Sequence, residues 1–315
     1  MKMSAGQWWK NFSLVKELDI AGSFIYNGLR SFHEMDSLHY ESEVFEVLYG
    51  LSVGVERLLK ICVILLEHDS AVDQEAFEKS LITHTHSDLA RRIQEKHDLG
   101  LTSPYNEFLS LLGEFYKTHR YGRYGMEMAI GGESEKTLLA NYLEKQLQIK
   151  FSDNAPFDIT QLDKRCRKCL GKRVGTLCEK LYEVINKEAS RLNIFTYELR
   201  NSSKASRIFL RKKYDFYDDD VLLKELLIFL IHSDPEHEHA GVLRLIRNIE
   251  PLDFDAGMLQ EYIASFGSRV ATEDILDELE HHYSDVANVG ERLDCIDAIG
   301  NPHVFFNSDE NEYQE

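Results

Sequence analysis

The segment EFYKTHRYGRYG, residues 114–125, brings basic and aromatic side chains together in one short stretch. Arginine supplies planar donors that fit phosphate oxygens, tyrosine rings stack on unpaired bases, and histidine can remove a proton. If a helix continues through residue 124, His119 and Arg123 are four residues apart and share a face. Arg120 and Tyr124 then form a second such pair. These residue types predict a site for an RNA end or a phosphorylated nucleotide.

A structural explanation of the same residues stays open. Basic residues near the end of a helix complement the negative end of its dipole. An arginine–tyrosine network can also hold a helix end against carboxylates such as Glu56 or Glu114. Glu56 lies among apolar neighbours, and an isolated buried charge is costly. We expect it to form an ion pair with Lys60, four residues on, and Arg120 is the other cation considered for it.

The charge is distributed unevenly along the 315 residues, whose formal net charge is −18. Residues 214–315 contain 25 Asp and Glu against 5 Lys and Arg, a net charge of −20. Residues 1–213 contain 29 Asp and Glu against 31 Lys and Arg, a net charge of +2. Residues 160–213 alone have 15 basic and 5 acidic residues, a local charge of +10. A change of this size predicts a domain boundary near Tyr214.

The basic run KRCRKCLGKR, residues 164–173, is the second candidate surface. It can bind a phosphate backbone or an acidic partner. The alternative is a solvated loop neutralised by the acidic C-terminal domain. The residues expected to contact RNA here and in the first segment are Tyr121, Lys164, Arg165, Arg167, Lys168, Lys172 and Arg173.

Apolar residues recur every three or four positions over long stretches, which predicts an all-α protein. The pattern is longest over residues 43–67, where a largely apolar circumference indicates a central helix. Gly50 and Gly54 share one face of that helix and would let a neighbouring helix approach closely. Further helices are expected from residue 103 to about 122, and near 134–149, 175–200, 203–212, 219–232, 238–249, 255–266, 272–283 and 285–298.

The common signatures of nucleotide and hydrolase chemistry are missing, among them the GxxxxGK[ST], HExxH and GxSxG motifs. Cys166 and Cys169 form a CxxC without a second pair, and the basic residues beside them oppose a cation. The histidines His84 and His86, and the cluster around His237, are more readily explained as a capped helix start and a polar loop. We therefore expect no cofactor and no metal. No apolar run approaches the roughly 20 residues that a bilayer needs, and the five scattered cysteines argue against disulfides, so we expect a soluble, cytoplasmic protein without membrane contact.

Several segments resemble the helical HEPN superfamily. YGLSVGVERLLKICVILLEHD, residues 49–69, is similar to its glutamate-bearing helix. THTHSDLARRI, LLGEFYKTHRYGRYG and ELRNSSKASR follow in a similar order, so that the resemblance covers roughly residues 40–212. It implies a helical bundle that forms a homodimer and acts on RNA, in many members as a metal-independent ribonuclease of toxin or antiphage systems.

The motif of that superfamily is an arginine, a polar residue and a histidine four to six positions after the arginine. Arg200 and Asn201 match its first half, but no histidine follows at that distance from either Arg200 or Arg120. His119 instead precedes Arg120. Three alternatives remain: a degenerate relative that binds RNA without cutting it, a variant that uses His119 or a tyrosine, and a relative with another activity.

We therefore expect a HEPN-like bundle over residues 1–213 and an acidic helical domain over residues 214–315. The expected function is RNA-directed, with phosphate held by Arg120 and Arg200, His119 as the candidate base and Glu56 in support. The catalytic candidates are His119, Arg120, Arg123, Tyr124 and Arg200. A non-enzymatic interaction protein whose acidic domain binds a basic protein partner is the alternative.

Overall fold

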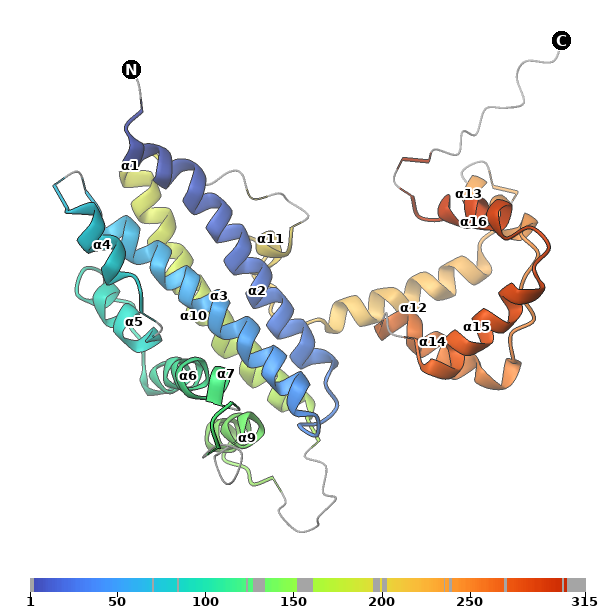
Figure 1. Ribbon diagram of the computed structural model, residues 1–315, viewed down its shortest axis with the longest axis horizontal. Coiled ribbons are helices and arrows are strands. Elements are labelled where there is room, and N and C mark those ends of the chain that lie inside the picture. The colour runs from blue at the N-terminus through green and yellow to red at the C-terminus, as the bar shows by residue number, and fades with distance from the viewer. Residues whose placement is uncertain are drawn as a thin grey trace. The chain divides into compact units, whose positions relative to one another are not determined.

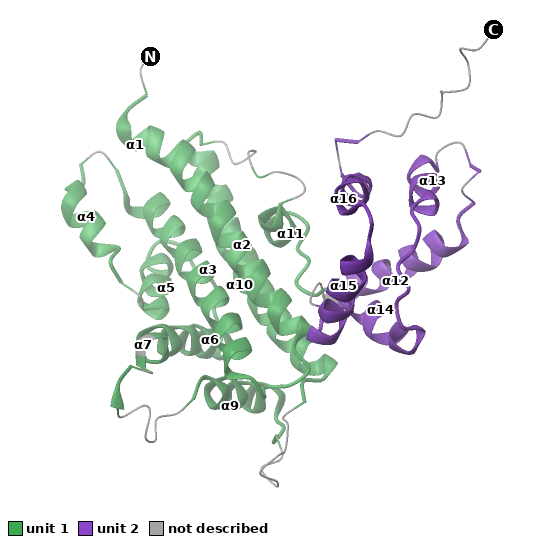
Figure 2. Ribbon diagram, turned by 45° about the vertical axis from the view of Figure 1, so that its right-hand side comes forward, with its two compact units in different colours: residues 1–216 green, residues 217–315 purple. Residues whose placement is uncertain are grey.

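The computed structural model describes residues 3–69, 71–83, 85–122, 124–126, 134–151, 161–194, 199, 203–234, 236–237, 240–268, 271–301 and 303–304. Over these residues the chain is helical and contains no β-strand (Figure 1), which confirms the all-α prediction. The chain forms two compact units, Met1–Phe216 and Tyr217–Glu315 (Figure 2).

Three long helices run side by side in the first unit (Figure 1). They are α2 (Leu14–Glu34), α3 (Glu41–Glu67) and α10 (Lys164–Arg191). Helix α3 is buried over most of its circumference and contacts both of the others. The remaining elements are α1 (Ala5–Trp8), η1 (Trp9–Ser13), α4 (Gln74–Ser80), α5 (His86–Gln94), α6 (Ser103–Glu114), η2 (Phe115–His119), α7 (Arg120–Gly122), α9 (Glu135–Leu147) and α11 (Lys204–Phe209). The position of α3 agrees with the central helix expected for residues 43–67.

Two glycines of α3 allow α2 to approach it closely, as the sequence predicts. A Cβ atom on Gly50 would lie 3.1 Å from backbone atoms of Gly28 and Phe24. A Cβ atom on Gly54 would lie 2.9 Å from the carbonyl oxygen of Ala21. Because the atoms in the way belong to the backbone, the spacing of the two helices depends on the missing side chains.

Helix α10 begins at Lys164, about ten residues before the start expected at 175. The cause is an N-cap: the Asp163 carboxylate accepts hydrogen bonds from the backbone N–H groups of Arg165 (2.8 Å) and Cys166 (3.0 Å). The alternative of a solvated loop over residues 164–173 is therefore wrong, because the basic run forms the first turns of a long helix.

Replacing the N-cap Asp163 by alanine is expected to lower the free energy of unfolding by about 1 kcal/mol, because two backbone donors lose their acceptor. Asp163→Asn keeps an oxygen acceptor and is the matched control. Hydrogen bonds from the Arg165 side chain and the Cys166 backbone lower the pKa of Asp163 from 3.8 to about 2. A carboxyl group whose pKa is lowered in the folded state stabilises the fold at pH values above its ordinary pKa. This contribution is lost as the pH falls through about 2. Urea unfolding at neutral pH tests the cap, and equal stability of Asp163→Ala and wild type would contradict it.

The first unit extends to Phe216, close to the boundary expected near Tyr214. Phe216 is fully buried, with the guanidinium carbon of Arg207 4.6 Å from its ring centroid and the Tyr26 ring edge-on at 5.1 Å. Tyr214 packs against α10, where a Cβ atom on Gly171 would lie 2.8 Å from the Tyr214 carbonyl oxygen. Tyr214 and Phe216 therefore pack as part of the first unit.

The second unit consists of α12 (Tyr217–His232), α13 (Gly241–Asn248), η3 (Ala256–Met258), α14 (Leu259–Ser268), α15 (Glu273–Asp285) and α16 (Val289–Asp297). Of its described residues, Ala240 alone is buried. Throughout the part of the chain that the structure covers, the helices are too short or too polar to cross a bilayer.

Candidate functional site

Arg120 lies against two tyrosine rings at the point where α6 continues through the π-helical turn η2 into α7. Its guanidinium carbon is 4.5 Å from the ring centroid of Tyr116 and 5.4 Å from that of Tyr49 on α3. All three side chains are partly exposed. We call Arg120, Tyr116 and Tyr49 the arginine–tyrosine cluster. A cation over the face of an aromatic ring is attracted by the quadrupole of that ring.

The aromatic support of this cluster continues into the core. Tyr49 stacks on Phe45, with ring centroids 6.0 Å apart and an interplanar angle of 9°. Phe45 in turn packs edge-on against Phe115, the fully buried first residue of η2, at 5.2 Å. Because these contacts join α3 to η2, they fix the distance between Tyr49 and the turn that carries Arg120.

Arg120 pairs with an earlier tyrosine than the one that the sequence predicted. Arg120 contacts Tyr116, which precedes it, and the described helix ends at Gly122, where the carbonyl oxygen accepts a hydrogen bond of 2.7 Å from the Gly125 N–H. Tyr124 lies in the turn that follows and is 90% exposed. The expected helical pair of Arg120 and Tyr124 is therefore wrong. π-Helical turns inside α-helices are frequent at functional sites.

The candidate base His119 is the last residue of η2 and is only 2% exposed. Its Nδ1 atom is buried and has no hydrogen-bond partner among the described residues. Because the imidazole is buried, it would not contact an RNA substrate bound at the surface. His119 and Arg120 are thus adjacent in the sequence, but one faces the interior and the other lies at the surface.

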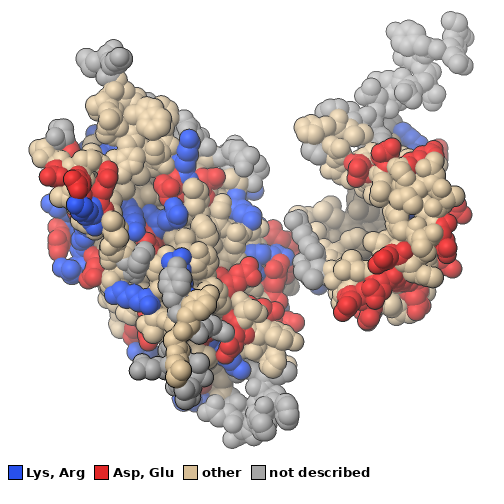
Figure 3. All heavy atoms as spheres, viewed as in Figure 1, with Lys and Arg blue, Asp and Glu red and all other residues tan. Residues whose placement is uncertain are grey.

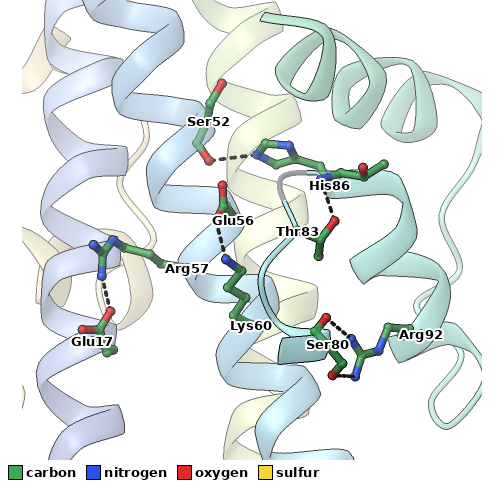
Figure 4. Close-up of polar contacts among 10 residues, drawn as sticks. Glu17, Ser52, Glu56, Arg57, Lys60, Ser80, Thr83, His86 and Arg92 are labelled. Atoms are coloured by element: carbon green, nitrogen blue, oxygen red, sulfur yellow. Dashed lines mark hydrogen bonds and ion pairs between the residues drawn. The ribbon is translucent and has the colours of Figure 1, made fainter. Parts of the chain in front are cut away.

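Figure 4 shows polar contacts that α3 makes within the helix and with α5. Lys60 Nζ donates a hydrogen bond of 2.6 Å to the Glu56 carboxylate, which confirms the expected ion pair. One turn earlier, the Ser52 carbonyl oxygen accepts a hydrogen bond of 2.8 Å from Nε2 of His86. His86 is the first residue of α5 and is fully buried, so it joins α5 to α3.

Three of the predicted site positions cannot be located. Arg123 and Arg200 lie outside the described residues, and so does the side chain of Tyr121. The structure therefore places Arg120 and Tyr124 at the surface and His119 inside, without locating the second motif arginine.

Comparison with family models, curated proteins and solved structures returns no match for this chain. The resemblance to the HEPN superfamily therefore depends on the residues quoted above.

The basic residues at the start of α10 fall into two groups. Arg167 donates a hydrogen bond of 2.7 Å to the Met35 carbonyl oxygen, and Arg173 donates one of 3.0 Å to Gln146 and lies over the Tyr105 ring. Arg165 pairs with Asp163 at 2.7 Å. The side chains of Lys164, Lys168 and Lys172 are exposed, and in the described part of the chain neither Lys168 nor Lys172 has a hydrogen bond or ion pair. These two lysines are the members of the group best placed to meet an anionic ligand.

The cysteine pair of α10 has the character of core residues. Burial raises the pKa of the Cys166 thiol to about 11 and raises the pKa of Cys169 as well. Metal binding requires thiolates, so a raised pKa opposes it. Across the described residues, no three His, Cys, Asp or Glu side chains are grouped closely enough to hold a metal ion.

Two residues of the cluster were not predicted as site residues. Tyr116 lies in the segment of residues 114–125, but the helical pair predicted there joins Arg120 to Tyr124 instead. Tyr49 comes from a helix interpreted as core. A usable signal was present, because Phe45 and Tyr49 are four residues apart and place two aromatic rings on one face of α3.

Proposed function

We propose that this protein binds RNA, and that the arginine–tyrosine cluster contacts an unpaired nucleotide. The observation that supports the proposal most strongly is the position of Arg120, whose guanidinium lies over two partly exposed tyrosine rings. The resemblance to HEPN proteins points to RNA as the ligand, and it also implies a homodimer.

The chemistry of the three side chains suits a nucleotide. A guanidinium that stacks through its faces keeps its N–H groups at its edges, where phosphate oxygens are bound. Tyrosine rings offer stacking surfaces that accept any base, and each stacked base contributes about 1–3 kcal/mol. Since the cluster is held by packed aromatic side chains, little conformational entropy is lost on binding.

Binding without cleavage is the form of the function that fits the geometry best. Metal-free cleavage needs a group that takes the proton of the ribose 2′-hydroxyl. His119, the candidate for that task, is buried. We therefore propose a degenerate HEPN-like RNA-binding protein.

A salt titration tests this proposal with the full-length protein. We expect the affinity for a fluorescent single-stranded RNA, measured in EDTA, to fall linearly on logarithmic axes as salt increases. Replacing Lys168 and Lys172 together by alanine should reduce the slope by about 1.4, because each phosphate contact on a single strand contributes about 0.7. The matched control replaces the exposed Lys16 and Lys79 on other helices. An unchanged slope in the α10 variant would exclude these lysines, and the absence of RNA binding by the wild type would refute the proposed function.

A further inference from the structure

Helix α12 exposes apolar side chains around its whole circumference. Nine of the eleven residues from 221 to 231, VLLKELLIFLI, are apolar. None of the side chains of this helix is buried: Phe229 is 66% exposed, Ile231 68% and Leu222 55%. A helix that is apolar on all sides is normally enclosed by other elements. The apolar side chains of α12 are therefore exposed, although its composition is typical of an enclosed helix.

The other helices of the second unit do not compensate. Their exposed apolar residues include Leu259, Ile263, Phe266, Leu276 and Leu293. Ala240 is the unit's single buried residue among those described. Exposed apolar surface of this extent is typical of a protein-binding site.

The charge of the unit identifies the kind of partner. Residues 217–315 contain 24 Asp and Glu against 5 Lys and Arg, a net charge of −19. Acidic residues begin in the first turn of α12, at Asp218, Asp219 and Asp220. Figure 3 shows mainly acidic charge on the visible face of this unit, whereas both signs are mixed on the visible face of the first unit. A second copy of the same unit would bring like charges together, which opposes self-association.

We propose that α12 binds a partner protein whose contact surface is apolar at its centre and rimmed by lysine and arginine. The apolar side chains near Phe229 would enter the centre of the interface, where aromatic anchors contribute most of the affinity. The surrounding carboxylates would face the basic rim, which accelerates association and excludes acidic partners. A partner that encloses α12 on several sides would supply the cover that a helix apolar all round normally has. The inference is independent of RNA binding by the first unit.

Two designed helical peptides test the inference with the full-length chain. The first is a fluorescent amphipathic peptide of leucine and lysine, and the second has the same apolar pattern with glutamate in place of lysine. We expect the basic peptide to bind at least tenfold more tightly than the acidic one. Replacing both Phe229 and Ile231 by aspartate should weaken binding of the basic peptide at least tenfold. The added negative charge would strengthen purely electrostatic attraction, so a loss of affinity reports the missing apolar contact.

The control is Ile82→Asp, which changes a residue of the first unit that is 77% exposed. It should bind the basic peptide as the wild type does. Equal affinity for the two peptides, or undiminished binding by the double variant, would overturn the proposal. So would a self-association in sedimentation that the double variant abolishes, because α12 would then be covered by a second copy. Binding of wild-type protein to neutral phospholipid vesicles that the double variant loses would assign the surface to lipid and would also overturn it.

Discussion

Replacing Arg120 by alanine is expected to weaken binding of single-stranded RNA at least about tenfold, which corresponds to about 1.4 kcal/mol. The variant loses both the charge that would meet a phosphate and the planar group that lies over the rings of Tyr116 and Tyr49. Circular dichroism should remain helical, because Arg120 is partly exposed and alanine is the strongest helix former. Fluorescence anisotropy at fixed salt measures the change.

Two further variants separate charge from geometry. Arg120→Lys keeps the charge but lacks the planar group, so its affinity should lie between those of the wild type and Arg120→Ala. Arg91→Ala is the matched control. The Arg91 side chain on α5 is 67% exposed, and its guanidinium nitrogens lie 3.6 Å from carboxylate oxygens of Asp88 and Glu95. Equal losses in Arg120→Ala and Arg91→Ala would indicate that net charge alone matters. An unchanged affinity in Arg120→Ala would place the RNA elsewhere.

Replacing Gly54 by alanine is expected to lower the free energy of unfolding by about 1 kcal/mol, the overpacking cost less the gain in helix propensity. The new methyl group would lie 2.6 Å from Cγ1 of Ile25 and 2.9 Å from the Ala21 carbonyl oxygen and the Ile25 backbone nitrogen. Forcing α2 and α3 apart costs about 1–3 kcal/mol, typical of overpacked cores. This cost exceeds the gain in helix propensity of about 1 kcal/mol that alanine brings.

Gly113 provides the matched comparison for that experiment. It is also a buried helical glycine, in α6, but a Cβ atom there would lie no closer than 3.8 Å to Nδ1 of His86. Gly113→Ala should therefore be as stable as the wild type or up to about 1 kcal/mol more stable. Chemical denaturation of the two variants measures the difference. Equal effects would show that the close approach at Gly54 does not determine the spacing of the helices.

The features predicted correctly from the sequence are those that depend on local pattern. Apolar periodicity identified α3 as the central helix, and the four-residue spacing of Gly50 and Gly54 predicted that a neighbouring helix approaches it closely. The Glu56 and Lys60 pair followed from the cost of burying a charge. Each of these inferences uses residues within one helix, where spacing determines which side chains share a face.

The features that were missed depend on segments far apart in the sequence or on unusual backbone. No helix was expected before residue 43, although α2 is one of the three long helices. Tyr116 and Arg120 are four residues apart, so helical spacing did indicate their contact, but the π-helical turn η2 between them was not expected. Tyr49 reaches Arg120 only because α3 and η2 are packed together, and the burial of His119 follows from the same packing.

The position of the RNA on the protein is the most direct test of the account. A single-stranded RNA containing 4-thiouridine, irradiated in complex with the full-length protein, attaches to the side chains nearest its bases, and mass spectrometry identifies the peptides. We predict attachment within residues 114–126 or at Tyr49. Attachment only elsewhere in the first unit, or only in residues 217–315, would contradict the assignment of the arginine–tyrosine cluster as the RNA-binding site.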